Sequence, residues 1–439
     1  MTIYKDLKTT NRTIGSGIDV SSGTIKLDGN YPTGTNNVAL GKDALDSGSL
    51  SGVQNTAIGE LSMTTTTSGG GNSAYGYTSL CANNTGASNT AIGVSALMAS
   101  TTASHNTAVG RTSLRKNTTG QCNVAVGSNA SACNTTASNN TAVGFSSLCA
   151  NTTGTPNVAV GNFSLCANTT GASNTGVGFC ALRNNTEGNS NTGFGRSALQ
   201  TNSTGVDNTA VGRNALINST ASENTAVGSC ALRTNTTGSR NTAYGKDSLK
   251  ANTTGVNNTS SGYNSMGLNT EGTRNSAYGY SALGSNTTGN CNTAIGCGSL
   301  GGNTTASNNT ALGFDSLKAN TTGANNVAVG NLTLDANTTG SCNLGNGMYS
   351  LTSNISGDCN TAVGYASLAS NTTANNNTAV GFRAMDKNTT GTSNVSVGVD
   401  SLRCNTTGSE NTAVGLNAGK LITTGGANVA VGHSALEDN

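Results

Sequence analysis

The sequence predicts an all-β fold, a parallel β-solenoid of about 24 coils, and three observations support this prediction. A pattern of seventeen residues, N-T-A-V-G-x-x-S-L-x-x-N-T-T-G-x-x, repeats from Asn37 onward, and residues 140–156 are one copy. The fifth position of every copy is Gly, and the flanking columns hold small or β-prone residues. Seventeen residues divided by a fixed Gly leave no room for a helix with an apolar stripe of period 3.6.

The repeat is regular in length. Asn opens 24 copies, and 21 of the 23 intervals between them are seventeen residues long. The exceptions are an eighteen-residue interval that begins at Asn37 and a sixteen-residue interval that begins at Asn208. Because an insertion in one coil would shift its contacts with both neighbours, this regularity indicates similar coils stacked along one axis.

The chain divides into two predicted parts. Residues 1–36 lie outside the repeat, and residues 37–439 form the predicted solenoid. Within the first part, residues 14–20 and 23–29 alternate like two short strands bounded by turn residues. This part is too short for a core of its own. We therefore expect it to cap the solenoid or to attach it to another protein.

Each column of the repeat has a predicted role, described here for the copy at residues 140–156. The fixed Gly144 indicates a positive φ or a backbone approach that leaves no room for a Cβ. Ala142 belongs to a column of Ala, Gly and Ser, which indicates close contact with another surface. Val143 and Leu148 belong to mainly apolar columns and are expected to fill the core.

Two short strands are expected in each coil, at residues 141–143 and 146–148 of the same copy. Asn and Gly around the Thr pair of residues 151–154 provide the turn. Each strand is expected to pair in parallel with its equivalent in the next coil. At about 4.8 Å per coil, the rod would be roughly 110 to 120 Å long.

One coil buries few large side chains, so further stabilisation is expected. Identical columns of Asn can form hydrogen-bonded ladders between coils. Several chains can also pack together, and we expect a homotrimer with residues such as Ala142 close to the subunit contact. A monomeric solenoid is the alternative.

The composition argues against several other classes of protein. The 439 residues include 60 Gly but only 2 Pro, unlike collagen or a polyproline linker. A net charge of +2 and a strict period differ from disordered chains. No basic surface or apolar run of about 20 residues is present, so we expect no nucleic-acid partner and no membrane insertion. Residues 1–6 do not resemble a signal peptide, so synthesis in a cytoplasm is expected.

No catalytic, metal or cofactor site is predicted. Catalysis needs unlike residues that converge in one pocket, whereas this array repeats small polar residues. The two histidines, His105 and His433, are isolated in the sequence. The twelve cysteines lie in different columns without a CxxC pair, which favours small apolar side chains in a reducing compartment. Cys149 and Cys166 share a column and could be close enough to oxidise.

The repeats resemble those of two groups of proteins. The run N-T-A-V-G-x-x-S-L, as at 140–148, resembles the S-V-A-I-G-x-x-S-x-A head repeat of the YadA-like trimeric autotransporter adhesins. That resemblance implies a left-handed parallel β-roll with three chains in a trimer. The opening residues 23–32, followed by arrays such as 55–59, resemble repeat-rich virion proteins of marine and cyanobacterial tailed phages. This second resemblance covers the whole chain and implies a tail fibre or another slender trimeric appendage.

The predicted function is therefore that of a non-enzymatic, homotrimeric rod, a structural fibre of a phage virion that acts as a stiff spacer. Assembly is expected in the host cytoplasm, with residues 1–36 bound to other virion proteins. The distal coil, with His433, Glu437 and Asp438, is the predicted contact with a host surface receptor or glycan. The alternatives are a self-assembling extracellular fibril, a bacterial-type adhesin, and an ice-binding solenoid that presents Thr152 and Thr153 to water.

Overall fold

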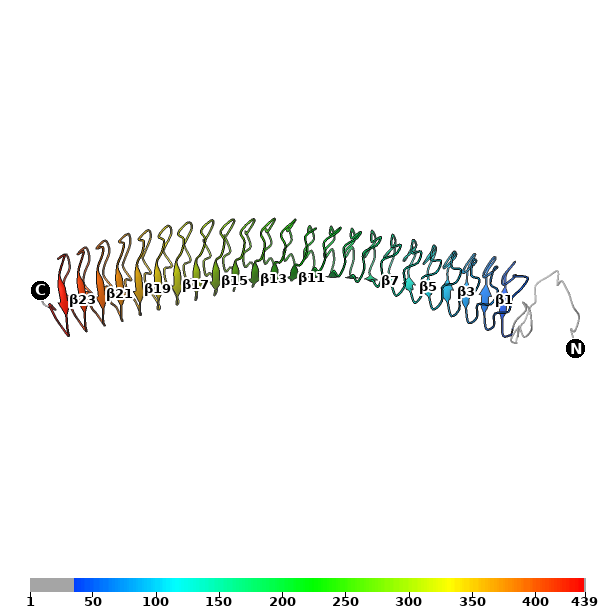
Figure 1. Ribbon diagram of the computed structural model, residues 1–439, viewed down its shortest axis with the longest axis horizontal. Coiled ribbons are helices and arrows are strands. Elements are labelled where there is room, and N and C mark those ends of the chain that lie inside the picture. The colour runs from blue at the N-terminus through cyan, green and yellow to red at the C-terminus, as the bar shows by residue number, and fades with distance from the viewer. Residues whose placement is uncertain (1–34, 438–439) are drawn as a thin grey trace, which may run out of the picture.

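The computed structural model describes residues 35–437 and shows them as a long parallel β-solenoid (Figure 1). These residues contain 24 strands of three residues each and no helix. The coils stack along a gently bowed rod, with β1 (Val38–Leu40) towards one end and β24 (Val429–Val431) at the other (Figure 1). The predicted all-β solenoid is therefore confirmed. The two strands expected within residues 14–29 lie outside the described residues.

Each strand comprises the second to fourth residues of one repeat, most often with the sequence T-A-V. Between β1 and β24, the strands are β2 (Thr56–Ile58), β3 (Ser73–Tyr75), β4 (Thr90–Ile92), β5 (Thr107–Val109), β6 (Val124–Val126), β7 (Thr141–Val143), β8 (Val158–Val160), β9 (Thr175–Val177), β10 (Thr192–Phe194), β11 (Thr209–Val211), β12 (Thr225–Val227), β13 (Thr242–Tyr244), β14 (Thr259–Ser261), β15 (Ser276–Tyr278), β16 (Thr293–Ile295), β17 (Thr310–Leu312), β18 (Val327–Val329), β19 (Leu344–Asn346), β20 (Thr361–Val363), β21 (Thr378–Val380), β22 (Val395–Val397) and β23 (Thr412–Val414).

Every strand pairs in parallel with the strand of the next coil, and residues of one column face each other. The same register holds across both irregular intervals. Val38 lies opposite Thr56 across the eighteen-residue interval, and Thr209 lies opposite Thr225 across the sixteen-residue interval. The added or missing residue is therefore accommodated outside the strands, so the columns stay aligned along the whole rod.

The second predicted strand, at residues 146–148, does not form. Ser146 and Leu148 both have a φ of 51°, the left-handed region that strands do not use. The segment still bonds to both neighbouring coils, because the N–H of Leu148 donates to the carbonyl of Ser164 at 2.9 Å and that of Ser146 to Ser128 at 3.0 Å. The bonding continues between coils here, but the left-handed residues replace an extended strand by a turn.

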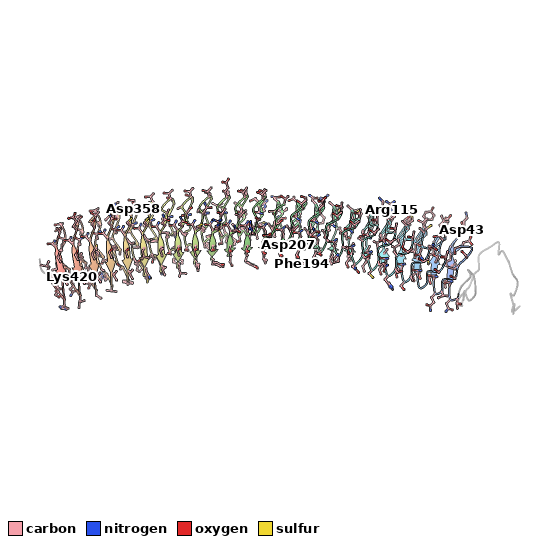
Figure 2. All side chains as sticks on the ribbon, viewed as in Figure 1. Asp43, Arg115, Phe194, Asp207, Asp358 and Lys420 are labelled. Atoms are coloured by element: carbon pink, nitrogen blue, oxygen red, sulfur yellow. The ribbon has the colours of Figure 1, made fainter. Side chains whose placement is uncertain are left out.

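The core is built from the third and ninth columns, with Ala of the eighth column added in several coils, and the prediction that the fourth column fills it is wrong. Ala142 and Leu148 are at most 1% exposed. Val143 is only partly buried, and larger residues of its column face solvent, such as Phe194 at 54% exposure (labelled in Figure 2). Successive strand residues point to opposite faces, so an inward Ala forces both of its neighbours outward.

The predicted place of Ala142 in a subunit contact is also wrong. Its side chain is 1% exposed in a single chain, where it belongs to the continuous core of the coil. A second chain could reach this side chain only by opening the coil. The small third column instead allows the strand to approach Leu148 closely across a narrow coil. Contacts between chains must therefore use outward columns.

Gly144 confirms the expectation for the fixed Gly column. Its φ is +129°, a backbone conformation that side chains disfavour. A Cβ at this position would also lie 2.7 Å from the carbonyl carbon of Gly161 in the next coil. The column thus needs Gly for both reasons considered from the sequence, at the bend where the strand ends.

Two buried ladders of Asn link the coils, as predicted. In the first column, the N–H of Asn157 donates to Oδ1 of Asn140 at 2.8 Å, and Nδ2 of Asn140 donates to the carbonyl of Gly154 at 3.1 Å. In the twelfth column, Nδ2 of Asn151 donates to Oδ1 of Asn134 at 3.1 Å and to the same Gly154 carbonyl at 3.0 Å. The ladders pair polar groups whose burial without partners would cost about 1 to 3 kcal/mol each.

The twelfth-column ladder is interrupted wherever another residue replaces Asn. Each ladder donor comes from the following coil, so a missing Asn leaves the Oδ1 of the preceding Asn unpaired. Within residues 35–437, three such buried Oδ1 atoms have no hydrogen-bond partner. The sites are Asn83 before Ser100, Asn202 before Ser219, and Asn405 before Ile422.

The Ser100→Asn variant is expected to be more stable than the natural chain by about 1 to 3 kcal/mol, because a new rung pairs Oδ1 of Asn83. The buried Oγ of Ser100, which has no partner in the described part of the chain, is removed at the same time. Urea unfolding monitored by circular dichroism measures the change. Ser104→Asn is the matched control, because Asn189 already occupies the same column, and it should leave the stability unchanged. Equal stability of both variants would contradict the ladder account.

The ninth, Leu-rich column has two breaks, a Gly whose space another side chain occupies and a buried Ser. Gly419 lacks a side chain, but a Cβ there would lie 3.0 Å from Cδ1 of Ile422, which therefore occupies the space. Ser131 is 1% exposed, and its Oγ has no hydrogen-bond partner within residues 35–437. A small polar residue thus stands in the core between Leu114 and Leu148 of the adjoining coils.

The Ser131→Leu variant is expected to gain about 1.5 to 3 kcal/mol, since it buries a Leu side chain and removes the unpaired hydroxyl. The backbone is already suitable, because Ser131 has the positive φ found for Leu148. Thermal unfolding should shift upward. The control Ser128→Leu adds the same side chain in the outward sixth column, where Leu416 occurs naturally, and should have little effect. A lower midpoint for Ser131→Leu would contradict the prediction, because it would mean that the coil packs around the smaller Ser side chain and has no room for Leu.

Candidate binding surfaces

The first and last residues of β1 to β24 form one continuous outward surface, which we call the strip. In 23 of the 24 strands the middle residue is buried and its two neighbours are partly or fully exposed. The strip contains Thr and Val mainly, with Ile, Leu, Ser, Asn346 and a few aromatic residues, and no Asp, Glu, Lys, Arg or His. Sequence reasoning missed this surface, although uncharged residues on both sides of a small residue were visible in every repeat.

The strip is large for an exposed, uncharged surface. With 24 strands at about 4.8 Å and two residues spanning about 6.6 Å, it covers roughly 750 Å². About half of this area belongs to the mainly apolar fourth column, because Thr and Ser dominate the second column. An apolar patch of about 300 to 600 Å² is the largest on a typical monomer and is often functional. Several of its members are well exposed, including Leu40 at 58% and Ile92 at 41%. Such a surface is typical of a binding interface.

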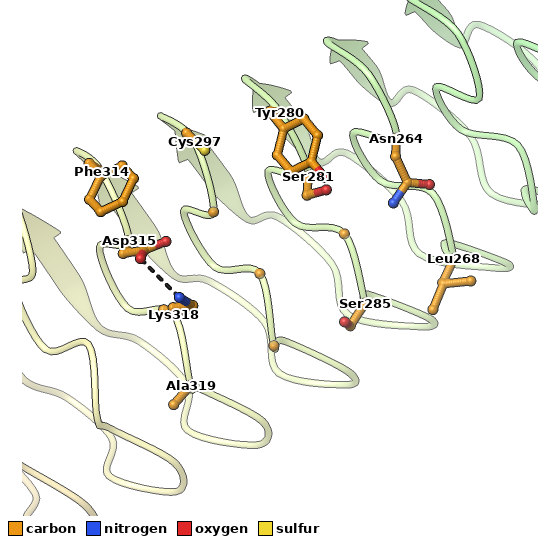
Figure 3. A pocket seen from close by; sticks show the side chains of 14 residues that line it. Asn264, Leu268, Tyr280, Ser281, Ser285, Cys297, Phe314, Asp315, Lys318 and Ala319 are labelled. Carbon is orange, nitrogen blue, oxygen red and sulfur yellow. Dashed lines mark hydrogen bonds and ion pairs between the residues drawn. The ribbon is translucent and has the colours of Figure 1, made fainter.

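A second feature is an open hollow beside β15 to β17, with a volume of about 790 Å³ (Figure 3). The tenth column carries Gly in three consecutive coils and nowhere else in the chain, whereas other coils have residues such as Arg183 there. The three are Gly267, Gly284 and Gly301. Missing side chains in adjacent coils thus produce the depression. The triplet is visible in the sequence, but only the stacking register shows that it forms one surface.

Exposed side chains border the hollow. Tyr280 and Phe314, 58% and 52% exposed, belong to the sixth column two coils apart, and the small Cys297 lies between them (Figure 3). Tyr280 also stacks on Tyr263 of the preceding coil, with ring centroids 5.6 Å apart and planes inclined by 10°. The other border includes Leu268, which is 56% exposed. Aromatic rings therefore line one border of a floor of small residues, and an aliphatic side chain lies on the other.

A charged pair closes one part of the hollow. Nζ of Lys318 donates a hydrogen bond to Oδ2 of Asp315 at 2.9 Å (Figure 3). The Asp315 side chain is only 13% exposed and lies over Gly298, where a Cβ would collide with its Oδ1. The hydrogen bond and charge of Asp315 raise the pKa of Lys318 above its ordinary value. Because the two charges pair, this end is polar but carries no net charge.

The structure places two of the three predicted host-contact residues in the last coil. His433 is exposed, and Glu437 is half-buried with Oε1 3.8 Å from Nζ of Lys420. Asp438 lies outside the described residues. Glu437 thus already has a partner of opposite charge. Their role in host contact stays a prediction.

The two Thr columns expected to bind ice differ in how their hydroxyl groups are used. Thr152 directs its Oγ1 to the carbonyl of Thr169 in the next coil at 3.1 Å, so its hydroxyl is used within the rod. Thr153 is exposed. Only one Thr column of this turn is therefore free to face water.

The cysteines are all free thiols among the described residues. Burial raises the pKa of the Cys149 thiol to about 11, and the neighbouring Cys166 adds to the shift. Both side chains are half-buried. A thiol with so high a pKa is mostly protonated at neutral pH and reacts slowly, which agrees with a packing role.

Comparisons with known proteins identify no relative: no protein-family model matches the chain, and no curated protein matches it significantly. Residues 35–437 contain no helix of the length and apolarity needed to cross a bilayer. In the same range, His, Cys, Asp and Glu form no group of three or more that could hold a metal ion.

Proposed function

We propose that this protein is a non-enzymatic structural fibre of a phage virion, a tail fibre or a similar appendage, that acts as a stiff spacer. The observation that carries the proposal is the unbroken stack of 24 strands along one axis. At about 4.8 Å per strand the stack is about 115 Å long. The virion context comes from the resemblance of the repeats to phage appendage proteins, with residues 1–36 as the attachment to other virion proteins.

The fibre is proposed to be a homotrimer in which the strips of three chains face one another. An uncharged strip of this size loses water favourably when a like surface covers it. The coils repeat with nearly the same period, so parallel chains in register bring each strip residue against the same residue of the neighbouring chains. In a threefold ring, each chain contacts one neighbour through one edge of the strip and the other neighbour through the opposite edge, and the ring closes.

The mass and shape of the purified chain test this assembly. One chain is 43.3 kDa, so light scattering should give a particle three times as heavy. Small-angle scattering should show a rod. A monomeric mass would refute the trimer, and a compact particle would refute the rod.

Charged strip variants locate the interface. Val143→Lys combined with Val160→Lys places two ammonium groups in the strip, and desolvating them is expected to convert trimers to monomers. The matched control, Ser128→Lys with Asn162→Lys, adds the same charges in the outward sixth column, where Lys246 occurs naturally. The control should remain trimeric. Dissociation of both variants, or of neither, would contradict an interface at the strip.

The genes beside the coding sequence test the virion context. Genes for baseplate, tail or capsid proteins on both sides would support the proposal. A neighbourhood of secretion or surface-layer genes would favour the bacterial adhesin or the extracellular fibril instead. Electron microscopy adds a second criterion, because a fibre subunit gives discrete rods whereas a self-assembling fibril gives open-ended filaments.

Ice binding is the second candidate, and the strip is the observation that favours it. Thr and Val alternate with buried Ala on a regular parallel sheet without charges. Phe194, Tyr244 and Tyr278 project from the same face, however, and interrupt its regular surface. Thermal hysteresis of the natural chain tests this candidate. A freezing-point depression that the Val143→Lys, Val160→Lys double variant abolishes would establish ice binding. The absence of any freezing-point depression would exclude it.

A further inference from the structure

The hollow beside β15 to β17 combines features that suit one class of ligand. Its borders are the exposed rings of Tyr280 and Phe314, and its floor contains Gly298 and Gly301 (Figure 3). Polar side chains, including Asn264, stand around the apolar surface. Ligand sites of proteins commonly join apolar area with a few polar groups that fix orientation.

The spacing of the two rings suits an extended ligand. They occupy the same column two coils apart, a separation of about 9.6 Å along the rod. No large side chain intervenes, because Cys297 holds that column in the coil between them. A ligand with flat apolar faces at successive units can therefore rest on both rings at once.

The electrostatics favour a neutral ligand with hydroxyl groups. Lys318 and Asp315 pair with each other at 2.9 Å, so neither an anion nor a cation finds an unpaired charge there. The pair still offers N–H donors and carboxylate acceptors at its exposed edge. Asn264, Ser281 and Ser285 add amide and hydroxyl groups that can both donate and accept.

We infer that this hollow binds a neutral oligosaccharide. A pyranose ring has a face of C–H bonds that packs on an aromatic ring, and its rim of hydroxyls needs both donors and acceptors. The hollow provides both the aromatic rings and the hydrogen-bond donors and acceptors. As a contact with a host surface glycan the site rests on the proposed fibre function, and it would lie along the shaft rather than at the distal coil.

Binding is tested by titration calorimetry of the full chain with hexasaccharides of glucose, N-acetylglucosamine, galactose and mannose. At least one is expected to bind. Combining Tyr280→Ala with Phe314→Ala should weaken that binding at least about tenfold, or about 1.4 kcal/mol. The control Tyr77→Ala removes an equally exposed ring of the same column far from the hollow, and it should bind normally.

A second variant fills the hollow without removing a contact. Gly284→Lys introduces a side chain that the tenth column accepts in other coils, such as Lys250, and it should also weaken binding. Bound saccharide should in addition slow maleimide labelling of Cys297 but not of the distant, exposed Cys122. These two measurements distinguish loss of the site from loss of folding.

The inference is overturned if no hexasaccharide binds at millimolar concentration, or if the double variant and Gly284→Lys bind as well as the natural chain. Its failure is distinguishable from failure of the proposed function. Light scattering and small-angle scattering of the same samples report the trimer and the rod whether or not a saccharide binds.

Discussion

Replacing Gly144 with alanine is expected to destabilise its coil by at least about 3 kcal/mol. Two penalties add in this variant. The φ of +129° is strained for any residue with a side chain, and the new Cβ would lie 2.7 Å from the carbonyl carbon of Gly161. Neither can relax alone, because the backbone of Gly161 packs in turn against that of Gly178 in the following coil. Hydrogen exchange followed by mass spectrometry should show lost protection around β7 and β8.

The control for this prediction is Gly193→Ala, which adds the same methyl group to another buried Gly. Gly193 belongs to the third column, where most coils have Ala, and the nearest atoms to its Cβ would be at 3.2 Å. We expect a change of less than about 1 kcal/mol. In a stacked array, a damaged coil weakens mainly its neighbours. Uniform loss of protection from β1 to β24 after Gly144→Ala would therefore contradict the local account.

Replacing Asn151 with alanine is expected to cost about 1 to 3 kcal/mol, because it leaves one buried polar group without a partner. Oδ1 of Asn134 loses its donor, whereas Nδ2 of Asn168 loses the acceptor 2.9 Å away but still donates to the carbonyl of Gly171. The carbonyl of Gly154 keeps one donor, Asn140. Urea unfolding of the variant against the natural chain measures the cost.

The matched control is Asn162→Ala, in which an exposed amide is removed. Oδ1 of Asn162 accepts only an exposed bond, from the N–H of Phe145 at 3.2 Å, which water can replace. We expect a change within about 0.5 kcal/mol. If both variants lose equal stability, the buried position of the ladder is not what stabilises the coils.

Some local features were predictable because they repeat in one column. The role of Gly144 and the Asn ladders follow from residue types that recur in the same columns of the repeat. The left-handed conformation of Leu148 was not predictable, because Leu rarely has a positive φ and no residue pattern in the sequence indicates it. The burial of this side chain offsets the strain of its backbone, and burial is a property of the closed coil.

The candidate sites were likewise predictable from the sequence only in part. The Gly residues of the hollow and the aromatic residues of the sixth column can be read from the sequence, but their separation in the chain hides their proximity. Tyr280 and Phe314 are 34 positions apart and become neighbours in one surface only through the stacking register. His433, Glu437 and Asp438 were singled out only by their place near the end of the repeat array, and in the structure Glu437 pairs with Lys420.

The sequence by itself determined the period, the parallel stacking and the columns that must hold Gly or Asn, because an exact repeat makes every contact between coils a contact between like residues. Only the tertiary structure decided which columns face inward. Val143 and Leu148 are similar in hydrophobicity, yet one faces solvent and the other is buried. The reason is geometric: a strand that turns Ala142 inward must turn Val143 outward, and the narrow coil holds one Leu against one Ala. The fourth column, which was predicted to fill the core, thus forms one of the two rows of the strip.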